Sequence, residues 1–356
     1  MRQEELTGKV QTVLGIIDGD SLGVTLPHEH LLSDLTAYFV EPTEASQRKL
    51  AHEPVSLENL YWVKPHCLSH VDNMKLTDEQ LAIKEAMLYK LAGGDTIVEM
   101  SNIGLHRDPL GLARIARATG LNIVMGAGYY VGASHPPELA TRTEQEIAEE
   151  IVQDIMVGVD KTGVRAGVIG EIGCSLPLEN GERKVLHASA AAQQRTGAAL
   201  AIHPSRSDDL VLEIINILDD AGADLSRTII SHIDPFGFSQ ATCRKLADAG
   251  CYLEYDTFGY ADLFPPYQGR VLDIPSPTQR INDIIQLIAD GYLDQILISG
   301  DICYKHMLVN YGGYGYAHIL RDIVPLMRNK GMSDEQIHTL LVENPKRVLP
   351  FAPVKQ

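Results

Sequence analysis

The chain alternates eight times between a short apolar run rich in β-branched residues and a longer segment with helical periodicity. The eight runs are Gly23–Leu32, Thr96–Ser101, Asn122–Tyr130, Ala166–Cys174, Ala198–Ser205, Thr228–Asp234, Cys251–Gly259 and Gln295–Ile302. Their residues are apolar in succession rather than alternately, which is typical of strands covered by helices. The pattern therefore predicts an α/β fold, a parallel (β/α)₈ barrel of the TIM-barrel type.

Helical segments lie between these runs, and several of them end at a glycine suited to a C-terminal cap. They are Asp78–Ala92, Pro109–Thr119, Glu144–Val157, Glu182–Thr196, Asp208–Ala221, Ser239–Ala249 and Ile281–Asp290. We expect Lys9–Asp18, before the first strand, to form a short strand or hairpin over the amino end of the barrel. Residues 36–76, after the first strand, form a long insertion that should carry short helices. No Gly-, Ser- or Pro-rich linker divides the chain, so residues 1–356 are expected to form a single domain.

The composition narrows the classes of partner. The 356 residues include 30 Lys+Arg and 47 Asp+Glu, which gives a formal net charge of −17. Such a surface repels phosphate backbones and anionic lipids, so we expect neither nucleic-acid nor membrane binding. No apolar stretch approaches the ~18 residues of a membrane span, and the first residues lack the apolar core of a signal peptide. The five cysteines are widely spaced, which fits a reducing compartment, and we expect a cytoplasmic protein that binds a small molecule.

Metal-type side chains stand at the ends of the predicted strands. His28 and His30 lie in the first run, and the period of two in a strand places both side chains on one face, about 6–7 Å apart. An isolated pair of this kind is more often just polar residues near a strand terminus. Further side chains of this type end other runs, namely Glu171, His203, His232 and Asp301. All six therefore lie at the carboxyl ends of five parallel strands, the face on which barrel enzymes build their active sites.

Such a cluster indicates a metal centre. Buried imidazoles and carboxylates are stable only if cations or one another neutralise them. Four imidazoles and two carboxylates suit zinc, with manganese, iron or cobalt as alternatives. Six ligands exceed the need of one ion, whereas two ions that share a bridging carboxylate each keep an open position. We therefore expect two divalent metal ions per chain.

The motifs around these residues resemble a known family. LPHEHLL, GEIG, AIHP, SHID and SGDI resemble the corresponding motifs of the phosphotriesterase branch of the amidohydrolase superfamily. The resemblance extends from GKVQTVLG near the start of the chain to ENPKRVL near its end. The segments EPVSLENLYW and CYLEYDTFG are most similar to those of the animal-type phosphotriesterase-related proteins.

The resemblance implies a division of the ligands between two ions. His28, His30 and Asp301 would hold the more buried ion, and His203 and His232 the more exposed one. In phosphotriesterase itself the bridging residue is a carboxylated lysine, and in this chain its position is occupied by Glu171. A glutamate supplies both bridging oxygens without carbon dioxide. Its presence weakens the expectation of efficient organophosphate hydrolysis.

Charge dictates the expected chemistry. A hydroxide that bridges two divalent ions forms near neutral pH, and it attacks a carbonyl or phosphoryl centre polarised by the more exposed ion. Asp301 would touch both a metal ion and this nucleophile. We therefore expect Asp301 to act as metal ligand and as general base, passing the proton on to the leaving group.

Substrate specificity is expected in the loops that follow the strands. Arg206, three residues after His203, is a candidate to bind an anionic group such as a sulfonate, phosphate or carboxylate. The alternative is a surface arginine paired with Asp208 or Asp209. Tyr130 is a candidate hydrogen-bond donor to the developing oxyanion, or else a packing residue at the barrel mouth. The remaining candidates from these loops are Asn102 and Lys305.

Three functions follow from the resemblance. Animal-type members are associated with hydrolysis of N-acyl taurines, chiefly N-acetyltaurine to taurine and acetate, which makes this amide the leading substrate. The alternative is a lactonase that opens sugar lactones, with or without a phosphate group, and that has at most weak organophosphate esterase activity. A non-catalytic binding protein is the third hypothesis, as the name resiniferatoxin-binding of some relatives suggests, but the complete ligand set argues against it. Relatives are often dimers, so a homodimer is a further hypothesis by analogy.

Overall fold

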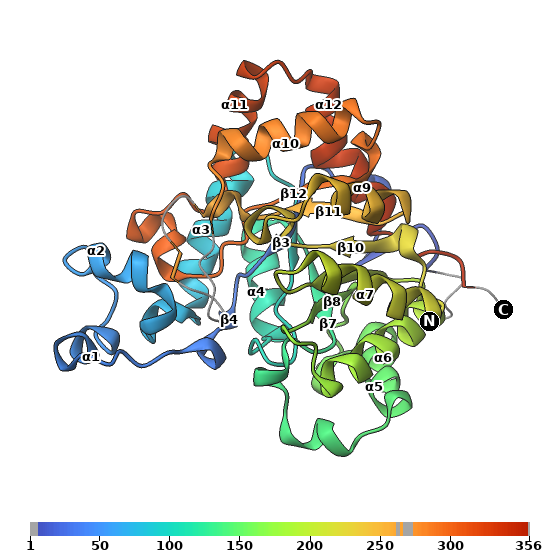
Figure 1. The fold of residues 1–356 in the computed structure, drawn as a ribbon, viewed down its shortest axis with the longest axis horizontal. Helices are drawn as coiled ribbons and strands as arrows, with labels where there is room; N and C mark the ends of the chain where they lie inside the picture. The colour runs from blue at the N-terminus through green and yellow to red at the C-terminus, as the bar shows by residue number, and fades with distance from the viewer. Residues whose placement is uncertain (1–5, 261–263, 266–272, 355–356) are drawn as a thin grey trace.

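The computed structural model describes residues 6–260, 264–265 and 273–354. Among them, eight strands form one parallel sheet in the order β12-β11-β10-β9-β8-β7-β6-β3. The strands are β3 (Thr25–Glu29), β6 (Thr96–Glu99), β7 (Asn122–Ala127), β8 (Val168–Gly173), β9 (Ala199–His203), β10 (Thr228–Ile230), β11 (Tyr252–Tyr255) and β12 (Ile296–Ile298). Each lies within one of the eight apolar runs, and helices surround them (Figure 1). The prediction of a (β/α)₈ TIM barrel is confirmed.

Side chains join the first and last strands of the sheet. Glu29, the last residue of β3, is fully buried. Its carboxylate accepts hydrogen bonds from Ser299 Oγ and from the backbone N–H groups of Gly300 and Ile302, each at 2.8 Å. These three residues are among the four that follow β12. This acidic side chain therefore helps to close the barrel between β3 and β12, together with the backbone hydrogen bond from the N–H of Asp301 to the carbonyl of His28 at 3.3 Å.

Helices follow the strands where the sequence predicts them. They are α3 (Glu79–Leu91), α4 (Pro109–Thr119), α5 (Glu144–Met156), α6 (Asn180–Thr196), α7 (Asp208–Asp220), α9 (Gln240–Asp248) and α10 (Pro277–Ala289). Helices α6 and α10 begin earlier than expected because capping boxes at Glu179 and Ser276 fix their starts. Shorter helices are α8 (Ile233–Phe236), α11 (Val324–Asn329), α12 (Asp334–His338) and α13 (Asn344–Val348). No helix in the described part of the chain is long and apolar enough to cross a membrane.

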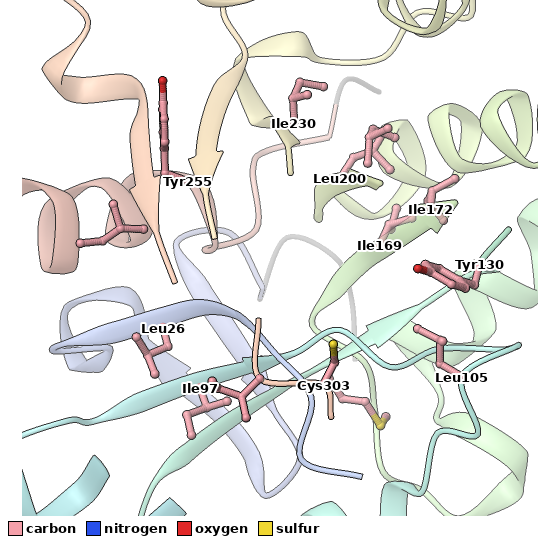
Figure 2. Packing of buried hydrophobic residues seen from close by; sticks show 14 of the residues in the cluster. Leu26, Ile97, Leu105, Tyr130, Ile169, Ile172, Leu200, Ile230, Tyr255 and Cys303 are labelled. Carbon is pink, nitrogen blue, oxygen red and sulfur yellow. The ribbon is translucent and has the colours of Figure 1, made fainter. Parts of the chain in front are cut away.

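The strands bury both of their faces. One set of strand side chains, which includes Leu26, Ile97 and Leu200, packs with apolar side chains of the surrounding helices; several members are visible in Figure 2. The alternate set, which includes Val98 and Val168, packs with itself inside the barrel. This alternation directs every second residue of a strand to the barrel interior. The register of β3 shifts between Leu26 and Glu29, and beyond this irregularity His28 and His30 face the interior, beside Glu171.

The segment before the first barrel strand forms the expected hairpin. Strand β1 (Lys9–Thr12) pairs with β2 (Gly15–Asp18) in antiparallel fashion. Val10 packs into the apolar cluster inside the barrel, and the N–H of Val13 donates to the carbonyl of Ile123 at 2.8 Å. Because Ile123 lies near the amino end of β7, the hairpin covers the end of the barrel opposite the strand termini that carry the predicted site.

The insertion carries short helices, as expected. Strand β4 (Ser33–Asp34) pairs with β5 (Lys75–Leu76) and joins its two ends. Between them lie α1 (Ala45–Ala51), α2 (Leu60–Val63) and short 3-10 turns, which project to one side of the barrel in Figure 1. Ala51, Leu60 and Trp62 belong to a small apolar cluster of their own.

Replacement of Glu29 tests the barrel closure. Glu29→Gln keeps the side-chain shape but replaces one of the two accepting oxygens with an NH2 group, which then faces at least one of the donors that follow β12. Because a buried unsatisfied donor costs about 1–3 kcal/mol, we expect the free energy of unfolding to fall by about that amount. Urea denaturation of chelator-treated protein measures it. Glu58→Gln, at an exposed position of the insertion, should leave the unfolding midpoint unchanged. An unchanged midpoint in both variants would show that Glu29 does not hold the closure.

Candidate metal centre

The six metal-type side chains converge at the carboxyl ends of the strands. They come from β3, β8 and β9 and from positions one to three residues beyond the ends of β3, β10 and β12. Each is at most 7% exposed; the residues are His28, His30, Glu171, His203, His232 and Asp301. The strand-end pattern in the sequence therefore identifies groups that the fold brings into one cluster.

The carboxylate of Glu171 lies at the centre of this cluster. Its Oε1 is 3.4 Å from Nε2 of His30. Its Oε2 is 2.9 Å from Nδ1 of His203, 3.3 Å from Nε2 of His232 and 3.6 Å from Nε2 of His28. One carboxylate is thus within 3.6 Å of a ring nitrogen of all four histidines.

Asp301 faces the first pair of histidines from the other side. Its Oδ1 is 3.4 Å from Nε2 of His30 and 3.9 Å from Nε2 of His28, and its Oδ2 accepts a hydrogen bond of 3.0 Å from the hydroxyl of Tyr260. Asp301 and His232 both have left-handed backbone conformations, with φ of 47° and 58°. Such conformations are strained for residues other than glycine and persist where the surroundings impose them. Here they turn two side chains into the centre at the point where their strands end.

Buried acids orient two of the imidazoles. His28 donates from Nδ1 to Oε2 of Glu254 at 3.0 Å, and His232 donates from Nδ1 to Oδ1 of Asp256 at 3.0 Å. Asp256 also accepts the backbone N–H of His232 through Oδ2, at 2.9 Å. Because a carboxylate only accepts, each Nδ1 carries a proton, and each Nε2 is turned toward the centre. This arrangement is common for histidines that bind metals.

The sequence pattern does not single out these orienting acids. Glu254 lies in β11 and Asp256 directly follows it. The segment CYLEYDTFG is otherwise mostly apolar, and its two acidic residues could have indicated buried partners for the histidines. Carboxylates are stable in a buried strand only when they have such partners. Ser101, whose Oγ is 3.0 Å from Nδ1 of His30, has the corresponding place beside the third imidazole and gives no such signal.

The protein groups shift one another's pKa in opposite directions. Burial favours the neutral imidazole, but Glu171 and Asp256 raise the pKa of His28 well above its ordinary value. Against burial, Asp301 and Glu171 raise the pKa of His30 to about 9. Burial raises the pKa of Glu171, but the imidazoles of His28, His203 and His232 outweigh this effect and hold that pKa well below its usual range. The cluster therefore stabilises positive charge, and a divalent cation can take the place of the protons held there.

The donor set fits metal ions. Three groups of ligand atoms each lie within 4.8 Å of one another. His28 belongs to all three, with His30 and Asp301, with Glu171 and His232, and with Glu254 and Asp256. Nε2 of His28 is buried and has no hydrogen-bond partner among the described residues. An orphaned buried nitrogen directed at carboxylate oxygens is what a cation would satisfy, and this mixture of imidazole and carboxylate suits zinc or a similar divalent ion.

A pocket opens above the cluster, with walls that are mostly apolar or aromatic. Besides cluster residues, its lining includes Leu35, Tyr38, Tyr130, Phe236, Tyr260 and Phe264. Tyr130, one of the predicted substrate-binding residues, is on this wall with its hydroxyl 3.5 Å from Nδ1 of His203. No lysine or arginine of the described residues lines the pocket.

The other three predicted substrate-binding residues are not on this wall. Asn102 is buried and donates from Nδ2 to the backbone carbonyl of Glu171 at 2.6 Å, so it supports the central carboxylate from behind. Lys305 forms an ion pair of 2.5 Å with Asp72, because the insertion folds back over the strand end. Arg206 is half-buried and follows β9 outside the pocket wall.

Comparisons with known proteins agree with this geometry. The model of the phosphotriesterase family matches residues 8–349. The chain is 43% identical to an N-acetyltaurine hydrolase of Dictyostelium discoideum, over 97% of this chain and 98% of that protein. It is 42% identical to an N-acetyltaurine hydrolase of Homo sapiens, over 97% and 99% of the two chains.

A solved structure is similar as well. The crystal structure of a resiniferatoxin-binding protein from Rhodobacter sphaeroides superposes with a TM-score of 0.92 at 37% sequence identity, over 96% of this chain and 95% of that one. The family model and these relatives cover nearly the whole chain, strand ends included, so the resemblance inferred from the motifs is confirmed. The chain belongs to the phosphotriesterase family.

Proposed function

We propose that this metal-dependent hydrolase cleaves the amide bond of N-acyl taurines, with N-acetyltaurine as its leading substrate. The observation that carries the substrate is the identity of 42–43% with N-acetyltaurine hydrolases, over nearly the full length of both chains. The cluster of imidazoles and carboxylates beneath an accessible pocket supports the chemistry. The hydrolysis adds water across the C–N bond and releases taurine and a carboxylate.

The proposed ligand roles are those that the family resemblance implies, and the donor group of His28, His30 and Asp301 agrees with them. His28, His30 and Asp301 would hold the more buried ion, and His203 and His232 the more exposed one, with Glu171 between them. Two divalent ions bound there would activate a water molecule and polarise the scissile carbonyl. The buried acids behind the imidazoles fix which nitrogen of His28 and His232 faces the centre.

Asp301 is the proposed general base. It is on the pocket wall, and its Oδ2 is directed away from the histidines toward Tyr260. Against burial, the neighbouring imidazoles hold the pKa of Asp301 below its ordinary value, so the carboxylate is available to accept a proton. It would take a proton from the attacking water and deliver it to the amine nitrogen as the C–N bond breaks.

The substrate and the metal requirement can be tested together. Zinc-loaded protein is expected to release taurine from N-acetyltaurine, and chelator-treated protein should be inactive until zinc, manganese or cobalt is restored. Taurine release is measured alongside the opening of a panel of aldonolactones. Turnover of lactones without turnover of the amide would contradict the substrate. Retained activity after removal of metal would contradict the metal requirement, and two bound ions without turnover of either class would indicate a binding protein.

Substitution of the proposed base has a defined effect. Because positioned acid–base catalysis contributes roughly 10²–10⁴-fold, Asp301→Asn should lower kcat by about this factor. Steady-state kinetics on N-acetyltaurine, with metal content measured in parallel, give the result. Asp220→Asn, at an exposed position of α7, is the control and should retain full activity. Undiminished turnover by Asp301→Asn would show that Asp301 is not the general base.

Arg206 remains the proposed partner of the sulfonate. It lies three residues beyond His203, and the described pocket wall has no lysine or arginine of its own. A charge-assisted hydrogen bond contributes about 1.5–3 kcal/mol, so its loss in Arg206→Ala should raise KM by roughly tenfold or more with little change in kcat. Arg206→Lys keeps the charge without the planar fork and should give an intermediate KM. If KM for N-acetyltaurine is unchanged in Arg206→Ala, another group binds the sulfonate.

A further inference from the structure

We propose that Tyr260 is a positioning residue for Asp301, whose carboxylate it orients through a hydrogen bond. The inference deepens the proposed function, on which its kinetic test rests. The hydroxyl of Tyr260 donates to Oδ2 of Asp301 at 3.0 Å, while Oδ1 faces His30 at 3.4 Å. A carboxylate that is held by one oxygen presents the other in a fixed direction. Tyr260 therefore determines which oxygen faces the histidines and which faces the pocket.

The direction of the hydrogen bonds follows from the chemistry of the groups. An ionised carboxylate only accepts, so the single proton of the phenol points to Asp301. Sγ of Cys303 lies 3.0 Å from the same phenol oxygen, which leaves the thiol as donor to Tyr260. Cys303 is buried, and it lines the pocket beside Tyr260. The three side chains thus form an ordered series from thiol to phenol to carboxylate.

The backbone fixes the phenol relative to the carboxylate. The N–H of Phe258 donates to the carbonyl of Ser299 at 3.3 Å, and the N–H of Gly259 donates to the carbonyl of Gly300 at 2.9 Å. A Cβ atom on Gly259 would lie 2.4 Å from that carbonyl oxygen, so only glycine permits this approach. The segment before Tyr260 is therefore attached directly to the segment before Asp301.

A buried arginine holds the same segment from its other side. Arg280 of α10 is fully buried and donates to the carbonyl of Tyr260 and to Oγ1 of Thr257, both at 3.2 Å. Its Nε forms an ion pair of 2.5 Å with Asp234, which lies in α8 two residues after His232. A buried pair of this kind is costly to break, so it fixes the geometry it joins. Tyr260 is therefore held in place relative to two strand ends, those at which His232 and Asp301 have left-handed backbone conformations.

Removal of the hydroxyl should affect metal binding before it affects the fold. Loss of an outer partner of a metal ligand typically costs about 10–100-fold in metal affinity or activity. In Tyr260→Phe, Asp301 loses its partner at Oδ2 and is free to rotate. We expect zinc affinity to fall by about tenfold or more and kcat at saturating zinc to fall with it, while KM changes by less than about threefold.

The test uses two readouts on the full chain. Zinc affinity is measured by competition with a chromophoric chelator, and kcat and KM are measured on N-acetyltaurine at saturating zinc. Unchanged zinc affinity would overturn the proposal, and so would a raised KM with unchanged kcat, which would make Tyr260 a substrate contact instead. If the wild-type protein hydrolyses neither N-acetyltaurine nor lactones, the proposed function fails, and zinc affinity alone decides the role of Tyr260.

Matched variants separate positioning from general loss of stability. Tyr89→Phe removes another tyrosine hydroxyl, one that donates to the carbonyl of Val24 at 2.9 Å near the opposite end of the barrel, and should leave zinc affinity unchanged. Cys303→Ala removes the donor to the phenol and should weaken zinc binding less than Tyr260→Phe does. Cys303→Ser keeps a donor and should bind zinc more tightly than Cys303→Ala. Equal zinc affinity in the alanine and serine variants would contradict the proposal that Cys303 orients Tyr260 and, through it, Asp301. This comparison remains decisive even if Tyr260→Phe fails to fold.

Discussion

The contact of one buried carboxylate with four imidazoles is the interaction on which the site depends. Glu171 is 2% exposed, and a carboxylate so far from water is stable as an anion only beside positive charge. Protonated imidazoles supply that charge within the protein, and bound divalent ions would supply it in the hydrolase. Metal binding and proton release are therefore coupled at this centre.

The barrel provides the rigid frame for this contact, and the same acids serve the frame and the site. Glu29 closes the barrel through the residues that flank Asp301. Asp256 holds both the backbone and the ring of His232. These acids stabilise two strand ends with left-handed backbone, where the chain leaves the sheet and turns a side chain inward. Stability and function thus depend on overlapping sets of hydrogen bonds.

Local periodicity made much of this structure predictable. Buried strands and helices leave a pattern in the sequence, so the eight strands, the amino-terminal hairpin and the helical insertion were all expected. The convergence of the six metal-type side chains was also predictable, because parallel strands end on one face of a barrel. Only the starts of α6 and α10 were placed too late, since their capping residues precede the apolar pattern.

Contacts that depend on long-range packing were not predictable. Lys305 was expected to face an anionic substrate, but its partner Asp72 lies 233 residues away and reaches it only because of how the insertion folds. The hydrogen bond from Asn102 to the carbonyl of Glu171 likewise joins two strand ends, and the sequence does not reveal how far each of them extends along the barrel axis. Tyr260 directly follows the seventh apolar run, which places it near the barrel mouth, but its contact with Asp301 joins residues 41 positions apart and leaves no local pattern.

The central claim is that the cluster holds two divalent ions with Glu171 between them. Anomalous diffraction at the zinc edge, from crystals of the zinc-loaded protein, tests this claim most directly. We predict two peaks roughly 3.5–4 Å apart. One should be bounded by His28, His30 and Asp301, and the other by His203 and His232. A single peak would contradict the account, as would zinc bound in the alternative group that His28 forms with Glu254 and Asp256.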